Sequence, residues 1–322
     1  MSIYHDDHEG FDRPRRRTRP RTKDRPDYSK APVARVISID RGRYRCKLDD
    51  VLVTAVRGRL VPRKGIIVGD RVRLDGDVSG TEGTLARIVQ VEPRSTMLRR
   101  SADDADTFER PIVANATQLM IVTALADPPP RVGMIDRILV AAYDARVEPI
   151  LCLTKADLGS PDELAGAYAP LGIPIVVTDP TSDLTDVHAI LAGERTVLIG
   201  HSGVGKSTLV NRLVPGTDRA TSEVSELTGK GRHTSTSALA IELPDGGWII
   251  DTPGVRSFGV SHVESGAIVE AFSDLAGFVE DCPRGCTHRS TEPECALDTA
   301  VAEGKLNEER LGSFRRMERA FT

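Results

Sequence analysis

The fold is decided at residues 199–211, which read IGHSGVGKSTLVN. This segment matches the pattern G-x4-G-K-[ST] at Gly200–Ser207, and it follows an apolar β run and opens a helix, as the motif requires. Its glycines let backbone N–H groups converge on phosphate, and the helix N-terminus adds a favourable dipole. We expect Lys206 to reach the β and γ phosphates and Ser207 to ligate Mg²⁺. The sequence therefore predicts a phosphate loop with these nucleotide contacts: Gly200, His201, Ser202, Gly203, Val204, Gly205, Lys206, Ser207 and Thr208.

The segments on either side of the loop alternate between two patterns. Apolar runs predict strands at 118–125, 148–154, 173–179, 195–200, 238–243 and 247–251. Amphipathic or capped segments predict helices at 132–145, 160–168, 184–193 and from 206 onward. Alternating strands and helices are typical of a parallel sheet covered by helices, so we expect an α/β domain.

A different pattern precedes this domain. Short β runs separated by Gly, Asp and Arg fill residues 32–91, with about five strands in some 60 residues. This spacing predicts a small five-stranded β-barrel of the oligonucleotide-binding type, and another small barrel, such as an SH3-like one, remains possible. The polar stretch at 92–111 is predicted to be a linker.

Charge is distributed unevenly along the 322 residues. Residues 13–25 carry eight Lys or Arg and one Asp, a net charge of +7, although the chain as a whole has −4. We expect residues 1–31 to be a disordered basic arm that contacts a polyanion such as nucleic acid, or else a solubilising tail. There is no apolar run of about 18 residues and no secretory signal pattern. We therefore expect a cytoplasmic protein without a membrane span.

The identity of the nucleotide depends on a second motif. Thr154, Lys155 and Asp157 belong to the segment TKAD at the end of a predicted buried strand, where open α/β sheets bind ligands. A carboxylate there can accept hydrogen bonds from N1–H and the 2-amino group of guanine, which adenine does not offer. The stem of Lys155 can pack over the base. The motif alone is also compatible with a surface turn.

A third motif, DTPG at Asp251–Gly254, follows the apolar strand GWII. Asp251 is expected to hold Mg²⁺ through water, and the N–H of Gly254 to meet the γ phosphate. Guanine, phosphate and Mg²⁺ motifs are thus all present, but TKAD precedes the phosphate loop instead of following it. With the barrel before and a Cys/His cluster after, the chain resembles the circularly permuted GTPases of the ribosome small subunit-dependent GTPase A (RsgA) family. The resemblance covers about residues 32–320 and includes the segments IDRILV, GKGRHTST and EPECAL.

Hydrolysis is assigned to the segment GKGRHTSTS at 229–237, where the first switch belongs. We expect Thr234, with Thr236 as the second choice, to close over Mg²⁺ and the γ phosphate. Val255 stands where many GTPases have the Gln that orients water, so another group must do this. The resemblance implies His233 as the catalytic residue, and a role in RNA contact or switch stability is the alternative.

The chain ends with a cluster of metal-binding residue types. Three thiolates and one imidazole within 14 residues are suited to a closed tetrahedral Zn²⁺ site. The predicted zinc ligands are Cys282, Cys286, His288 and Cys295. Their spacing is C-x3-C-x-H-x6-C, whereas the family pattern is C-x4-C-x-H-x5-C, so the two inner loops differ by one residue each. Cys46 and Cys152 lie in β runs and are predicted to be buried.

Four parts follow from these patterns: the arm at 1–31, the barrel at 32–95, the permuted GTPase domain at 96–262 and a mainly helical zinc module at 263–322. The resemblance implies a GTP hydrolase that binds the small ribosomal subunit through 16S rRNA, is stimulated by it and assists its late maturation. GTP/GDP, Mg²⁺ and one Zn²⁺ are the expected cofactors, and a monomer is expected. A metabolic P-loop ATPase or kinase and an RNA-binding module with incidental hydrolysis are the alternatives.

Overall fold

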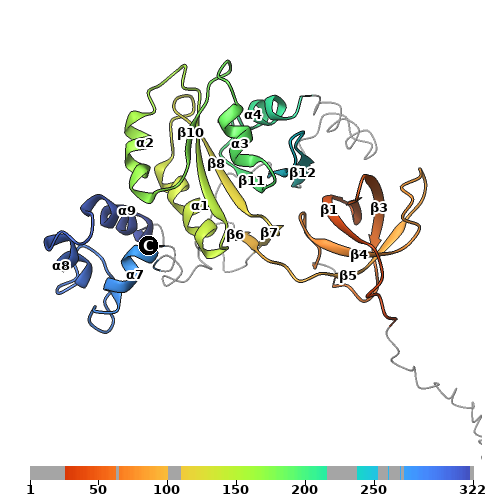
Figure 1. The fold of residues 1–322 in the computed structure, drawn as a ribbon, viewed down its shortest axis with the longest axis horizontal. Coiled ribbons are helices and arrows are strands. Elements are labelled where there is room, and N and C mark those ends of the chain that lie inside the picture. The colour runs from red at the N-terminus through yellow and green to blue at the C-terminus, as the bar shows by residue number, and fades with distance from the viewer. Residues whose placement is uncertain are drawn as a thin grey trace, which may run out of the picture. The chain divides into compact units, whose positions relative to one another are not determined.

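The computed structural model describes residues 26–62, 65–100, 110–215, 238–252, 260, 269 and 272–319. The chain divides into two compact units, Met1–Lys30 and Ala31–Thr322, and every element below belongs to the second (Figure 1). Among the described helices, none combines the length and the apolar character needed to cross a bilayer.

The α/β domain is built on a six-stranded part of a larger sheet, in the spatial order β10-β9-β8-β11-β13-β12. The first five strands are parallel, and β12 is antiparallel to β13. Their bounds are β8 Gln118–Ala124, β9 Glu148–Thr154, β10 Ile175–Val177, β11 Arg195–Ile199, β12 Leu239–Glu242 and β13 Trp248–Asp251. The alternation expected from the sequence is confirmed.

Helices cover both faces of this sheet. Figure 1 shows α1 and α2 on one side and α3 and α4 on the other. The bounds are α1 Val132–Asp144, α2 Asp162–Tyr168, α3 Thr185–Leu191 and α4 Lys206–Leu213, and a short 3₁₀ helix, η1, spans Ala169–Leu171. Leu119 and Ile121 of β8 pack into the core on the α1 side, whereas Met120 and Val122 pack into the core on the α3 and α4 side. Because successive strand residues point to opposite faces, a continuous apolar run is what a strand covered on both sides requires.

The barrel closes as the sequence predicts. Its strands are β1 Val33–Asp40, β2 Arg43–Leu48, β3 Val51–Arg57, β4 Arg71–Gly76 and β5 Ala86–Val91. They follow the order β1-β2-β3-β5-β4, and pairing of β1 with β4 closes the ring around residues such as Val36, Cys46 and Leu74. The barrel sheet continues into the α/β sheet, because Ser38 of β1 pairs with Leu239 of β12.

The prediction that residues 92–111 form a linker is wrong in part, because two segments of this stretch belong to strands. β6 at Met97–Arg100 and β7 at Arg110–Ala114 form an antiparallel hairpin around residues that the structure does not describe. Leu98 and Val113 are register partners and are fully buried, so these two apolar side chains fix the hairpin to the core. Behind it, the buried carboxylate of Asp70 pairs with Arg94 at 2.7 Å.

Three helices follow in the C-terminal part: α7 Ser273–Val279, α8 Ala296–Ala302 and α9 Glu308–Glu318. The side chain of Asn307 caps α9 by accepting hydrogen bonds from the N–H groups of Glu309 and Arg310. Phe314 of α9 packs edge-on against Phe272, with ring centroids 5.5 Å apart, and both rings are fully buried. The predicted C-terminal helix is therefore present, and the cysteine cluster lies between α7 and α8.

Candidate functional site

The phosphate loop connects β11 to α4, and its glycines have conformations that other residues rarely adopt. Gly203 and Gly205 have φ of 84° and 92°, in the left-handed region. Gly200 lies so close to β8 that a Cβ atom on it would be 2.2 Å from the carbonyl oxygen of Val122. The loop therefore packs tightly on β8 and leads into the N-terminus of α4, whose backbone N–H groups are suited to bind an anion.

The charged groups beside the loop are arranged for a metal–phosphate ligand. Lys206 Nζ donates a hydrogen bond to the carbonyl of Gly200 at 3.1 Å. Among the described residues, the buried Oδ1 of Asp251 has no hydrogen-bond partner. Burial raises the pKa of Asp251, and the nearby Lys206 opposes the shift. A buried carboxylate oxygen without a donor is suited to the hydration shell of Mg²⁺.

The TKAD segment begins where β9 ends. The hydroxyl of Thr154 donates to the carbonyl of Val204 in the phosphate loop at 2.6 Å. Lys155 has a φ of 58°, and its ammonium donates to the carbonyl of Asp127. Asp157 is exposed. The side chain of Thr154 is thus occupied by the loop backbone, which leaves Lys155 and Asp157 as the groups that can meet a base.

A neighbouring loop, residues 178–182, was not predicted from the sequence to belong to the site. Residues 178–182 follow β10, and the N–H of Ala156 donates to the carbonyl of Thr178 at 3.2 Å. Arg212 of α4 donates to the carbonyls of Asp179 and Ser182 in this loop. The loop therefore connects α4, the helix that follows the phosphate loop, to the end of β9, where TKAD begins. The Asp-Pro-Thr-Ser sequence after a short apolar run is the signal that could have identified it as part of the site.

A pocket lies beside the phosphate loop, on the side of α1. It is lined mainly by apolar side chains, including Met134, Ile135 and Ile138 of α1, together with Gly200 and His201 of the loop. Helix α1 and the phosphate loop therefore line the same pocket.

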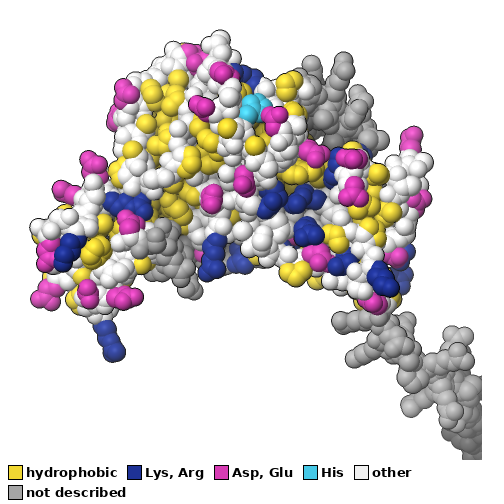
Figure 2. All heavy atoms as spheres, in the orientation of Figure 1, with side chains coloured by type: hydrophobic (Ala, Val, Ile, Leu, Met, Phe, Trp, Pro, Cys, Tyr) yellow, Lys and Arg dark blue, Asp and Glu magenta, His cyan; other side chains and the backbone are white. Residues whose placement is uncertain are grey.

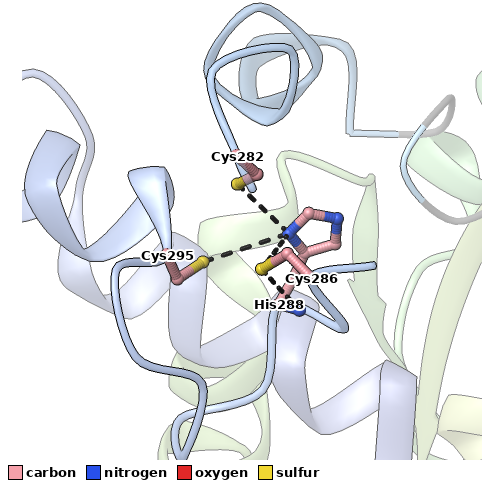
Figure 3. Close-up of side chains that lie close together, drawn as sticks. All are labelled: Cys282, Cys286, His288 and Cys295. Atoms are coloured by element: carbon pink, nitrogen blue, oxygen red, sulfur yellow. Dashed lines mark hydrogen bonds between the residues drawn. The ribbon is translucent and has the colours of Figure 1, made fainter. Parts of the chain in front are cut away.

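The four predicted zinc ligands converge (Figure 3). The thiols of Cys282, Cys286 and Cys295 lie 3.5, 3.5 and 3.9 Å from Nδ1 of His288, and all four ligand atoms are within 4.8 Å of one another. A neutral imidazole nitrogen carries at most one proton, so it cannot donate to three thiols at once. Tetrahedral coordination with Zn–S near 2.3 Å and Zn–N near 2.0 Å separates sulfur from nitrogen by about 3.5 Å.

The residues therefore fit one Zn²⁺, despite their altered spacing. The backbone of His288 is left-handed, with φ of 58°, which turns the ring towards the thiols. Desolvation raises the pKa of Cys286 to about 11, and Cys295 and Cys282 contribute in the same direction. Three thiolates at this spacing need a cation, which lowers thiol pKa values on binding. By contrast, Cys46 and Cys152 are buried, as predicted, and burial raises the pKa of each to about 12.

Several predicted residues lie outside the described part of the chain. These are His233, Thr234, Thr236, Gly254 and Val255. Of the predicted nucleotide contacts, the structure brings together the phosphate loop, TKAD and Asp251.

Comparison with known proteins gives a consistent result. The protein-family model described as RsgA GTPase matches residues 91–261. The small ribosomal subunit biogenesis GTPase RsgA of Alcanivorax borkumensis is 38% identical over 258 residues, which cover 77% of this chain and 71% of that protein. The protein of the same name from Azotobacter vinelandii is 37% identical, over 78% of this chain and 73% of its own.

Solved structures are similar in fold. The crystal structure of YjeQ from Thermotoga maritima superposes with a TM-score of 0.65 and 24% identity, covering 89% of this chain and 97% of that one. The crystal structure of YloQ, described as a circularly permuted GTPase, gives a TM-score of 0.64 and 23% identity, covering 92% and 96%.

Proposed function

Because the chain belongs to the RsgA GTPase family, we propose that it hydrolyses GTP on the small ribosomal subunit and assists the late maturation of that subunit. The chain is a GTP-hydrolysing enzyme of this family, and Mg²⁺ is the ion that GTP hydrolysis requires. The alternative of a metabolic kinase or ATPase therefore loses its support. The small subunit as partner is taken from the names of the relatives.

One observation carries the proposal for this chain. The hydroxyl of Thr154 bonds to the carbonyl of Val204 at 2.6 Å, so TKAD and the phosphate loop are parts of one site. In this chain TKAD precedes the phosphate loop, whereas in an unpermuted GTPase it follows the loop. The site is therefore that of a circularly permuted GTPase. The contact therefore supports a guanine nucleotide bound between Asp157 and the loop.

Within this site we assign the roles as follows. The backbone N–H groups of the loop hold the phosphates, Lys206 neutralises the β and γ phosphates, and Ser207 ligates Mg²⁺. Asp251 holds the water shell of Mg²⁺, and Asp157 selects guanine. Thr154 positions the loop by its bond to Val204.

For the chemical step we propose two residues outside the described part of the chain. His233 orients the attacking water, and Thr234 closes over Mg²⁺ and the γ phosphate. The N–H of Gly254 also contacts the γ phosphate. Replacing His233 by Ala should remove most of the turnover stimulated by the ribosomal subunit while leaving the affinity for GDP unchanged. Equal stimulated turnover in the variant would exclude this role.

The outer face of the barrel supports contact with 16S rRNA. Arg35 of β1 is the register partner of Lys47 on β2 and of Arg71 on β4, so three cations lie side by side across three strands, of which Lys47 also pairs with Glu242. Burial lowers the pKa of Arg35, and the charges of Arg195 and Arg71 lower it further. Figure 2 shows basic side chains gathered where Figure 1 places β1 and β4, with acidic ones beside them. Like charges placed directly opposite are unfavourable, and a phosphate between them relieves the repulsion.

We also propose the four-part division of the chain at 1–31, 32–95, 96–262 and 263–322. The separate core of the barrel, formed by residues between 34 and 91, supports the second boundary. We propose that the arm contacts RNA, that the protein is a monomer, and that it acts in the cytoplasm, where small subunits are assembled.

The test is phosphate release from GTP and from ATP, with and without purified small ribosomal subunits, at one fixed salt concentration. Salt must be fixed because contacts to nucleic-acid phosphates weaken steeply with it. Slow turnover of GTP alone, strongly raised by the subunit, is the expected result. GTP turnover without stimulation would remove the subunit as activator, and equal use of ATP would contradict the role of Asp157.

A further inference from the structure

A buried carboxylate on α1 takes no part in the site described above. Asp136, within the IDRILV segment, is only 3% exposed. It accepts a hydrogen bond from the hydroxyl of Tyr168 at 2.8 Å and one from Nε of Arg316 at 3.2 Å. The guanidinium of Arg316 also stacks on the ring of Tyr168, 4.7 Å from its centroid. Asp136 therefore connects α1 to Arg316 of α9, a residue 180 positions further along the chain.

This contact differs from an ordinary surface ion pair. The side chains of Asp136 and Arg316 are 4% and 23% exposed. Burial raises the pKa of Asp136 although Tyr168 and Arg316 favour its ionised form. A carboxylate buried at this cost depends on its partners, since loss of one partner leaves a charge without compensation.

Helix α9 also touches the cysteine cluster, through the two residues before Arg316. The Nε of Arg315 donates to the carbonyl of His288 at 2.8 Å, and its guanidinium pairs with Asp298. The ring of Phe314 lies 6.2 Å from that of His288. Residues 314–316 thus join the backbone of a predicted zinc ligand to α1.

Helix α1 and the phosphate loop border the same pocket. Met134, Ile135 and Ile138, which flank Asp136 in the sequence, line the pocket that Gly200 and His201 close. Contacts therefore run from the cysteine cluster through α9, Arg316 and Asp136 to α1, and α1 and the phosphate loop line one pocket.

We propose that the Asp136–Arg316 pair couples zinc binding at the cysteine cluster to nucleotide binding at the phosphate loop. A small module ordered by Zn²⁺ has two states, one with metal and one without, which gives the coupling its switching element. With zinc bound, α9 is held in place and fixes α1 against the loop. The proposal rests on the nucleotide site proposed above, and Asp136 acts in it as a positioning residue.

The experiment measures the affinity of the full chain for a fluorescent GDP analogue, with Zn²⁺ bound and after its removal by a zinc-selective chelator. Mg²⁺ and salt are held constant. We expect zinc removal to weaken GDP binding at least about five-fold, the lower end of measured couplings between sites. In Asp136→Asn and Arg316→Ala the ratio of the two affinities should fall towards one, while zinc-loaded variants still bind GDP.

Asp274→Asn is the matched control. It removes the same kind of charge from an ion pair on the same helix, with Arg310, but this pair joins α7 to α9 and reaches neither His288 nor α1. The control should keep the affinity ratio of the unchanged chain. If the loss of any ion pair on α9 lowered the ratio through stability alone, all three variants would change alike.

Linkage requires the reverse effect as well. GDP should slow the loss of Zn²⁺ to a chelating dye in the unchanged chain and in Asp274→Asn, but not in Asp136→Asn or Arg316→Ala. This arm starts from zinc-loaded protein, so it decides the question even if the metal-free chain does not bind GDP.

Two results would overturn the proposal: equal GDP affinity with and without zinc in the unchanged chain, or an unchanged ratio in both coupling variants. Failure of the nucleotide site itself would look different. In that case the zinc-loaded unchanged chain would bind GDP and ADP equally well, whatever the effect of zinc.

Discussion

Replacing Gly200 by Ala tests how closely the phosphate loop packs on β8. The added Cβ would lie 2.2 Å from the carbonyl oxygen of Val122 and 3.1 Å from its carbonyl carbon, whereas ordinary contacts begin at 3.4 Å. Both groups are backbone atoms, so relief requires the loop to move away from the strand by about 1 Å. A displacement of this size at a reacting centre costs about 100-fold in rate, and overpacking a core typically costs about 1–3 kcal/mol of stability.

We therefore expect Gly200→Ala to hydrolyse GTP about 100-fold more slowly and to bind a fluorescent GDP analogue more weakly. Its midpoint of thermal unfolding should fall by several degrees in the absence of nucleotide. Gly166→Ala is the matched control, because a Cβ at this position in α2 meets nothing within 4 Å. The control should bind GDP normally and gain roughly 0.5–1 kcal/mol, since Gly inside a helix is less favourable than Ala. GDP affinity within two-fold of the unchanged chain and an unaltered midpoint in Gly200→Ala would refute the close packing.

Three further changes test other parts of the site. Asp157→Asn should reduce the preference for GTP over ATP by at least about 100-fold in competition binding, because the carboxylate that pairs with guanine is lost; a preserved preference would exclude Asp157 as the selector. Cys286→Ser should lose stoichiometric zinc in metal analysis, whereas Cys152→Ala should keep it. Asp251 has a raised pKa in the folded chain, so its contribution to stability is present below the unfolded pKa and is lost as the pH rises through the folded value. Asp251→Asn should therefore become increasingly stable relative to the unchanged, nucleotide-free chain in urea unfolding as the pH rises above the ordinary Asp pKa of 3.8, and a constant difference would contradict this.

Local patterns account for the parts of the fold that could be predicted. The phosphate loop needs glycines at fixed positions, so its backbone follows from the residues themselves. The strands of the α/β sheet read as apolar runs because helices cover both faces, and the barrel strands alternate because only one face is buried. The cysteine cluster was predictable because four ligands within 14 residues have few other arrangements open to them.

Other features depend on contacts that a single sequence does not contain. The sequence does not predict the β6–β7 hairpin, because Arg99, Arg100 and Arg110 make the segment polar and the two buried apolar residues form no recognisable strand pattern. The bond from Thr154 to Val204 and the pair between Asp136 and Arg316 join residues that are 50 and 180 positions apart. Such pairs arise from the topology of the sheet and helices, and no local periodicity marks them.

The pairing of β1 with β12 has a consequence for the behaviour of fragments. β12 is the last strand on its side of the α/β sheet, and its outer backbone groups face β1 near the Ser38–Leu239 pair. A fragment that begins at residue 96 would lose β1 and leave this edge open. Open strand edges recruit strands from other chains. We therefore expect the barrel to prevent self-association through β12, and light scattering of the fragment beside the full chain would test this role.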